Sequence, residues 1–213
     1  MTEDNILDEN DLDDCFKAFK QDVVLNKKIY LSNKDKLVLR FHQELIVRKT
    51  SALIGKNNKS FLWGCKCRSG KTYMLGGIIV EQLRTKKKLN VLIVTPAPTE
   101  TLPQFTEDLF YKFGDFDAFS VHCLGDPARI EVGKNNIFVA SKQLLQQYVD
   151  KKTIACIRDL KLDIISFDEN HFGGTTELSK SILASYSSKH TVKIYLTATY
   201  YKPLRQWSIP PEC

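Results

Sequence analysis

The sequence predicts one doubly wound α/β domain, with a mainly parallel sheet and helices on both of its faces. Short apolar runs rich in β-forming residues alternate with helical patterns along most of the chain. Neighbouring strands in such a pattern are expected to be parallel, because parallel pairs need crossover connections. The chain has 213 residues, of which 43% are hydrophobic, so it has enough apolar material for a core on both sides of the sheet.

The chain begins with an acidic segment followed by two helical patterns. Residues 1–14 contain seven acids and no base, and so polar a segment is expected to be a disordered leader. A helix is predicted to begin near Asp11, where apolar residues start to recur at helical spacing. A second helix is predicted from Lys34 to about Leu53, and the turn residues that follow Gly55 end it.

The rest of the chain alternates between predicted strands and predicted helices. The strands are expected at the apolar runs 61–63, 91–94, 119–121, 137–139, 164–167 and 192–196. The helices are expected at 72–85, 103–112, 142–148, 153–160 and 177–186.

Charge and cysteine content indicate the environment and the class of partner. The whole chain has a formal net charge of +6, and without the seven acids of the leader the rest stands at +13. So basic a body attracts polyanions, of which nucleic acid is the usual one, whereas a solvated lysine surface is the alternative. No run approaches the ~20 apolar residues of a membrane span. The six cysteines are scattered without a disulfide framework, which indicates an intracellular, reducing compartment.

The stretch Gly64–Thr72, GCKCRSGKT, predicts a phosphate-binding loop. An apolar strand leads into it and a helical pattern leaves it, so that backbone N–H groups and the helix N-terminus face one concavity while Lys71 adds a mobile charge. The expected ligand is a nucleoside triphosphate with Mg²⁺. Cys65 stands where the pattern G-x-x-x-x-G-K-[ST] has glycine, and an ordinary strand-to-helix turn is the alternative.

Two further polar segments follow predicted buried strands. Asp168 and Glu169 come directly after the run 164–167, at the edge of the sheet where the phosphate loop is expected. There Asp168 would hold Mg²⁺ together with Thr72, and Glu169 would orient or deprotonate the attacking water. The segment 197–199, Thr-Ala-Thr, could bond the acidic turn, although from these residues alone a simple turn that caps the strand is the better explanation.

These segments together resemble motifs I, II and III of the superfamily 2 DExH-box helicases. They are Ser69-Gly70-Lys71-Thr72, Asp168-Glu169-Asn170-His171 and Thr197-Ala198-Thr199, in the order and at about the separations of that family. Weaker matches are Thr95-Pro96 to motif Ia, Ala140-Ser141-Lys142-Gln143 to motif Ib, and Leu39-Arg40-Phe41-His42-Gln43 to the segment whose glutamine reads adenine. The resemblance covers residues 37–201 and implies a RecA-like P-loop NTPase domain, the first motor domain of a helicase.

The resemblance also implies a role for each matching residue. ATP would be bound by Gln43, Gly64, Cys65, Arg68, Ser69, Gly70, Lys71 and Thr72. Thr72 and Asp168 would hold Mg²⁺, with Lys71, Asp168 and Glu169 as the catalytic set. Thr95, Pro96, Ser141, Lys142 and Gln143 would line a track for the nucleic-acid backbone, DNA more than RNA. His171, Thr197 and Thr199 would couple the nucleotide state to that track.

The family pattern further implies a division of the chain and a missing partner. Residues 1–14 would be the leader, 15–201 the ATP-binding domain, and 202–213 the start of a connection to a second RecA-like domain. Arg68 replaces a glycine that is usual in the family, and Phe41 replaces a proline. A small P-loop kinase and a non-catalytic nucleic-acid-binding scaffold are the alternative functions.

Overall fold

The structure is a computed structural model that describes residues 14, 16, 17, 34–66, 68–96, 98–124, 132–149, 154, 157, 160–168 and 177–198. Its centre is a six-stranded sheet in the order β1-β6-β5-β2-β4-β3, and every pair of neighbours is parallel. The strands are β1 (Ser60–Gly64), β2 (Asn90–Thr95), β3 (Phe119–Leu124), β4 (Asn135–Ser141), β5 (Ile164–Phe167) and β6 (Val192–Thr197).

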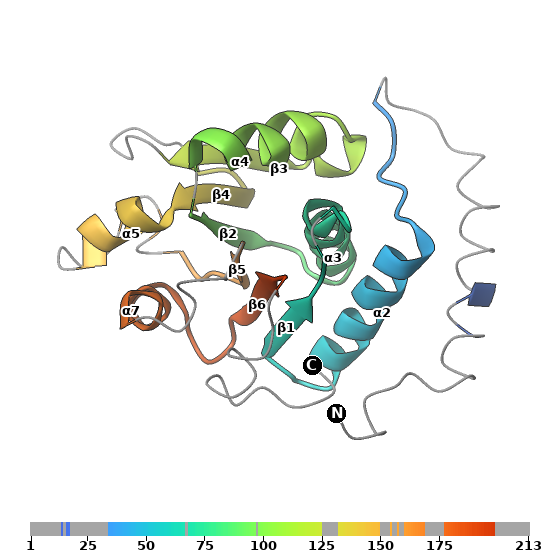
Figure 1. The fold of residues 1–213 in the computed structure, drawn as a ribbon, viewed down its shortest axis with the longest axis horizontal. Coiled ribbons are helices and arrows are strands. Elements are labelled where there is room, and N and C mark those ends of the chain that lie inside the picture. The colour runs from blue at the N-terminus through green and yellow to red at the C-terminus, as the bar shows by residue number, and fades with distance from the viewer. Residues whose placement is uncertain are drawn as a thin grey trace.

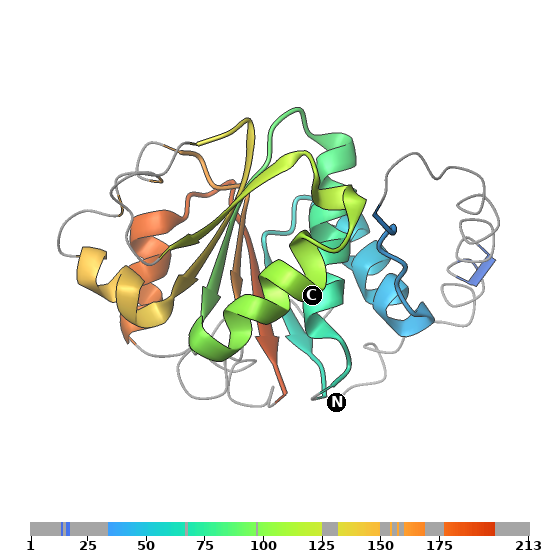
Figure 2. The same cartoon turned by 90° about the horizontal axis from the view of Figure 1, so that it is seen from above.

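Helices cover both faces of this sheet (Figures 1 and 2). On one face lie α2 (Phe41–Gly55), α3 (Lys71–Thr85), α4 (Pro98–Phe105) and the π-helical turn η3 (Thr106–Phe110), followed by the short η4 (Gly114–Phe116). On the other face lie α5 (Lys142–Val149) and α7 (Glu177–Tyr186). Successive strand residues point to opposite faces, so Val91 and Ile93 join the core under α3, whereas Leu92 and Val94 join the core under α5 and α7.

The predicted fold class is therefore confirmed. Each of the six apolar runs forms a strand, and the sheet is wholly parallel in the part of the chain that the structure describes. The strands at the centre of the sheet are buried on both faces, as the continuous apolar runs indicate; all six residues of β2 are buried. Among the described residues, no helix combines the length and apolar character that crossing a bilayer requires.

The predicted start of the second helix is wrong, because α2 begins at Phe41 and not at Lys34. The preceding residues are extended: Leu39 is buried and Leu37 packs on the core, whereas Val38 between them is 69% exposed. The Leu37 N–H donates to Asp115 Oδ2 at 2.8 Å, which fixes this segment beside η4. The alternation of Leu37, Val38 and Leu39 was a signal of period two that the helical interpretation overlooked.

The helix predicted at 103–112 begins earlier, with Pro98 as the first residue of α4. Proline suits that position because its missing N–H has no partner in the first turn and its fixed φ is helical. The helix continues past Pro103 into the π-helical turn, where Phe105, Leu109 and Phe110 are buried. Of the predicted helices near Asp11 and at 153–160, most residues lie outside the described part of the chain.

Candidate functional site

The stretch Gly64–Thr72 forms the predicted connection from strand to helix. Strand β1 ends at Gly64, the Cys65 N–H donates to the Thr197 carbonyl at 2.9 Å, and α3 begins at Lys71. Arg68 has φ +62° and Gly70 has φ +81°, both in the left-handed region. For arginine this conformation costs on the order of 1–3 kcal/mol, and such outliers cluster at functional sites. Glycine, which is usual at this position in the family, adopts such a conformation without strain, whereas Arg68 does not.

Gly70 occupies a position that strongly favours glycine. Besides its φ of +81°, a Cβ atom built on it would lie 2.2 Å from Gln43 Nε2. Gly70 is also the N-cap of α3, and no side chain caps this helix. The first N–H groups of a helix have no partners within the helix, so those of α3 are available to an anion in the loop.

Two side chains of α2 bind the carbonyl of Ser69. Gln43 donates to it from Nε2 at 3.0 Å, and His42 Nε2 lies 3.2 Å from it. His42 must be the donor because a carbonyl oxygen only accepts. Gln43 Oε1 accepts the Arg40 N–H at 2.9 Å, so its amide joins the start of α2 to the phosphate loop.

Gln43 is only 5% exposed, so it is not simply a polar residue on an exposed helix face. An amide nitrogen carries two hydrogens, and one of them is used at Ser69. The other is the group with which Gln43 would meet a base.

Asp168 lies at the same edge of the sheet as the phosphate loop. Strands β1, β6 and β5 are neighbours (Figure 1), with Gly64 paired to Thr197 and Phe167 paired to Tyr195. Asp168 directly follows β5, and its N–H donates to the Val94 carbonyl at 2.8 Å. Two strand spacings, about 10 Å, separate β1 from β5, a distance that a bound triphosphate and its metal can bridge.

Side-chain alternation places Asp168 on the face that α3 covers. Ile164 belongs to the core under α3, and residues two and four positions later continue that face. The first of these is Ser166, whose fully buried hydroxyl has no hydrogen-bond partner. An unsatisfied buried polar group calls for an explanation, such as a functional role or a bound water. Here it lies between the core and the predicted metal-binding carboxylate.

Cys65 fills the loop position for which the phosphate-loop pattern has glycine. Its side chain is buried, and burial raises the pKa of the thiol, while the Lys71 charge and the Ser69 hydroxyl act in the opposite direction. The thiol is therefore neutral at physiological pH and serves as a small apolar group.

The residues expected to form the nucleic-acid track meet at the ends of β2 and β4. Thr95 pairs with Ser141 in the sheet, and Gln143 Nε2 donates to the Pro96 carbonyl at 3.5 Å. Ser141 Oγ accepts the Leu144 N–H at 3.0 Å and so caps α5. These residues lie on the same edge of the sheet as the phosphate loop, because all the strands are parallel.

Two track residues have environments that the sequence did not indicate. Thr95 is fully buried, and its hydroxyl hydrogen-bonds to the Thr101 hydroxyl in α4. Partial burial lowers the pKa of Lys142. Of the coupling residues, Thr197 is buried and its carbonyl accepts the Cys65 N–H, whereas His171 and Thr199 lie outside the described residues, as does the catalytic candidate Glu169.

Residues 36–202 match the profile of ResIII, the type III restriction enzyme res subunit. The chain belongs to the ResIII family. No curated protein matches the ResIII chain at a significant level.

Solved structures share the fold of this ResIII domain. The SWI2/SNF2 ATPase core of Sulfolobus solfataricus in complex with dsDNA has a TM-score of 0.64 at 20% identity, over 84% of this chain and 36% of that one. The UvsW helicase from bacteriophage T4 has a TM-score of 0.59 at 14% identity, over 91% and 64%. A nuclease-deletion mutant of the type ISP enzyme LlaGI with a DNA substrate mimic has 0.55 at 14%, over 76% and 17%.

The ResIII chain spans less than two thirds of each of these proteins. Its fold is that of a superfamily 2 helicase-type RecA-like domain, as the resemblance of its motifs implied. Sequence reasoning missed His42, which binds the phosphate loop next to Gln43, and Thr101, which holds Thr95. Neither residue carries a pattern of its own, so only the packing of α2 and α4 reveals them.

Proposed function

We propose that this ResIII domain is the ATP-binding first motor domain of a DExH-type helicase or translocase that depends on nucleic acid. The observation that supports this most directly is the shared edge of the sheet: β1, β6 and β5 are parallel neighbours, so the phosphate loop and Asp168 end on the same side. In open parallel sheets, ligands bind beyond the carboxyl ends of the strands.

Each residue of this edge has a distinct task in the proposal. The loop from Gly64 to Gly70 surrounds the phosphates with backbone N–H groups, and Lys71 contacts the β and γ phosphates. Thr72 and Asp168 supply hydroxyl and carboxylate oxygens, the ligands that Mg²⁺ prefers. The magnesium ion, when bound, neutralises charge that develops on the transferred phosphate.

The remaining tasks fall to residues beyond the phosphate loop. Glu169 positions the attacking water and accepts its proton, and Gln43 offers an amide hydrogen to the adenine edge. His171, Thr197 and Thr199 couple the nucleotide state to the track.

The proposed partner is the phosphate backbone of DNA, along a track formed by Pro96, Ser141, Lys142 and Gln143. Thr95 lies behind the track and does not contact DNA in this proposal. Its hydroxyl forms a hydrogen bond with the Thr101 hydroxyl and so supports the track from inside the domain. Phosphate contacts position a strand without reading its sequence, so sequence preference is expected to be slight. The SWI2/SNF2 ATPase core, which has a similar fold and was solved in complex with dsDNA, supports DNA as the partner.

A second RecA-like domain completes the motor in this proposal. Arginines supplied by another domain are worth about 10³–10⁵ in the rate of phosphoryl transfer. We therefore expect weak ATP binding and little turnover from these 213 residues alone. The ResIII match favours a motor over the small P-loop kinase and the non-catalytic scaffold, and phosphoryl transfer to a nucleoside monophosphate would revive the kinase.

The proposal is tested by ATP binding and DNA-stimulated hydrolysis in a protein that contains both motor domains. Lys71→Ala should abolish binding, whereas Glu169→Gln should bind ATP but lose hydrolysis. Lys56→Ala is the control, because Lys56 is an exposed lysine outside the phosphate loop. Hydrolysis by Glu169→Gln at the rate of the parent protein, or unchanged ATP binding by Lys71→Ala, would refute the proposed function.

A further inference from the structure

Lysines gather at the edge of the sheet opposite the proposed nucleotide site. Because the strands are parallel, their starts share one edge. Five of the six strands have a lysine within three residues before they begin. We call this group the basic edge; it consists of Lys59, Lys87, Lys88, Lys134, Lys161 and Lys189.

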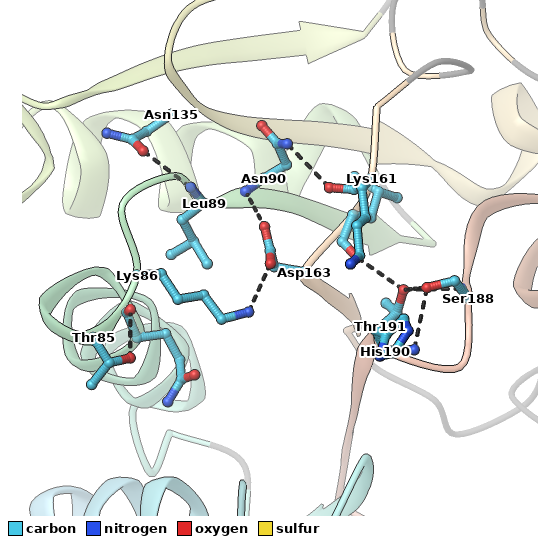
Figure 3. A network of polar contacts seen from close by, with 12 residues as sticks. Thr85, Lys86, Leu89, Asn90, Asn135, Lys161, Asp163, Ser188, His190 and Thr191 are labelled. Carbon is cyan, nitrogen blue, oxygen red and sulfur yellow. Dashed lines mark hydrogen bonds and ion pairs between the residues drawn. The ribbon is translucent and has the colours of Figure 1, made fainter. Parts of the chain in front are cut away.

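Most lysines of the basic edge are exposed, and none is paired with an acid that the structure describes. Five of its lysines are exposed and Lys59 is half-buried. None of them forms an ion pair with any part of the chain that the structure describes. Asp163 is the only acid among the described residues that lead into these five strands. It is occupied by Lys86 Nζ at 2.7 Å and by the Asn90 N–H at 3.0 Å, as Figure 3 shows.

Hydrogen bonds between strands fix the backbone that carries these lysines (Figure 3). The Asn90 side chain donates to the Lys161 carbonyl at 3.1 Å and accepts from Asn136 at 2.8 Å. The Leu89 N–H, next to Lys88, donates to Asn135 Oδ1 at 3.0 Å. The loops before β2, β4 and β5 therefore form one connected unit, so the backbone positions from which their lysines extend are fixed before any partner binds.

The extent of the basic edge is comparable to several base steps of a nucleic-acid duplex. In the spatial order of the strands, its members are Lys59, Lys189, Lys161, Lys88 and Lys134, with Lys87 beside Lys88. Four strand spacings of about 4.8 Å give a row of roughly 19 Å, which corresponds to about six base steps of 3.4 Å. Lysine is a point charge that contacts phosphates without reading bases.

We propose that the basic edge binds the phosphate backbone of duplex DNA as a second contact surface, on the side of the domain opposite the motor track. This inference relies on the proposed function for the identity of the polyanion. The acidic leader, residues 1–14, is the competing occupant, because its seven acids also complement the lysines. Duplex DNA is favoured because the lysines come from five strands and span roughly 19 Å of the sheet edge, and the phosphates of a duplex recur along its whole length.

The test is the salt dependence of binding between the full chain and a 20-base-pair DNA duplex, measured by fluorescence anisotropy from 50 to 200 mM KCl. Replacing Lys88, Lys161 and Lys189 with alanine should reduce the magnitude of the negative slope of log K against log salt by about 3. Each lost phosphate contact reduces it by about 1. The affinity at 50 mM KCl should fall about tenfold or more. A matched triple variant at Lys36, Lys49 and Lys112 removes the same charge elsewhere and should keep the parent slope.

The outcomes separate this inference from the proposed function. The basic-edge variant should bind MgATP like the parent chain, whereas Lys71→Ala tests the nucleotide site alone. Equal slopes for the two triple variants would overturn the inference and leave the nucleotide site untouched. The inference would also be overturned, in favour of the leader, by a different pair of results. The parent chain would show the same small slope as the basic-edge variant, and changing the leader acids to amides would increase the magnitude of that slope by about 3.

Discussion

Gly70→Ala should disrupt the phosphate loop through two separate effects. The first is conformational, because Gly70 has φ +81° and an L-residue in the left-handed region costs roughly 1–2 kcal/mol. The second is steric, because the new Cβ would lie 2.2 Å from Gln43 Nε2. The amide must then move and release the Ser69 carbonyl, which it binds at 3.0 Å. A hydrogen bond of this kind contributes about 1 kcal/mol.

The total expected loss for Gly70→Ala is therefore about 2–3 kcal/mol in the free energy of unfolding. For a chain of this length that corresponds to a fall in Tm of roughly 4–12 °C. Gln43→Ala should cost about 2 kcal/mol, because it removes the hydrogen bonds to both Ser69 and Arg40. In the double variant the steric effect is absent, so adding Gly70→Ala to Gln43→Ala should cost only about 1–2 kcal/mol.

A double-mutant cycle measures this directly by urea unfolding of the four proteins. A coupling energy of about 1 kcal/mol is expected, with the double variant more stable than the sum of the single losses. Strictly additive losses would refute the contact between Gln43 and Gly70. The same variants should bind ATP more weakly, which equilibrium dialysis detects.

Three further perturbations test neighbouring features. Arg68→Gly should raise the free energy of unfolding by about 0.5–1 kcal/mol, because it relieves φ +62°; a lower urea midpoint would contradict this. Thr50→Val should lower it by about 1–3 kcal/mol, because the buried Trp63 indole loses its acceptor at 3.1 Å, and an unchanged midpoint would count against it. Burial raises the pKa of Cys65, so the folded chain keeps a thiol proton that the unfolded chain loses. Stability should fall above about pH 8.5 and fall less steeply in Cys65→Ala, whereas identical pH profiles would argue against burial.

Much of the fold could be predicted because the signals were local. Runs such as Val91–Val94 are apolar at every position, which is typical of strands buried on both faces. The start of α2 could not be predicted, because Leu37 is fixed by Asp115, which lies 78 residues later in the chain. The start of α4 was predictable from Pro98 in the first turn, but the apolar pattern around Pro103 directed the prediction to a later residue.

The candidate site was predictable where a motif determines the backbone and unpredictable where packing does. Gly70 and Lys71 lie where the phosphate-loop pattern indicated, between β1 and α3. Asp168 was predicted to lie at the same edge as the phosphate loop because it directly follows a strand and the sheet was predicted to be parallel. The burial of Gln43 against Ser69 depends on how α2 packs beside the loop, which no local pattern encodes. The roles of Glu169, His171 and Thr199 stay predictions, since these residues lie outside the described part of the chain.

The most direct test of the central claim is metal-dependent nucleotide binding by Asp168→Asn. Mn²⁺ can replace Mg²⁺ at oxygen ligands, so electron paramagnetic resonance of Mn²⁺ with a non-hydrolysable ATP analogue reports the site. If the phosphate loop and Asp168 hold one metal–triphosphate, Asp168→Asn should lose the ternary Mn²⁺ signal and bind the analogue equally with and without metal. A ternary signal and affinity equal to those of the parent chain would contradict the shared site.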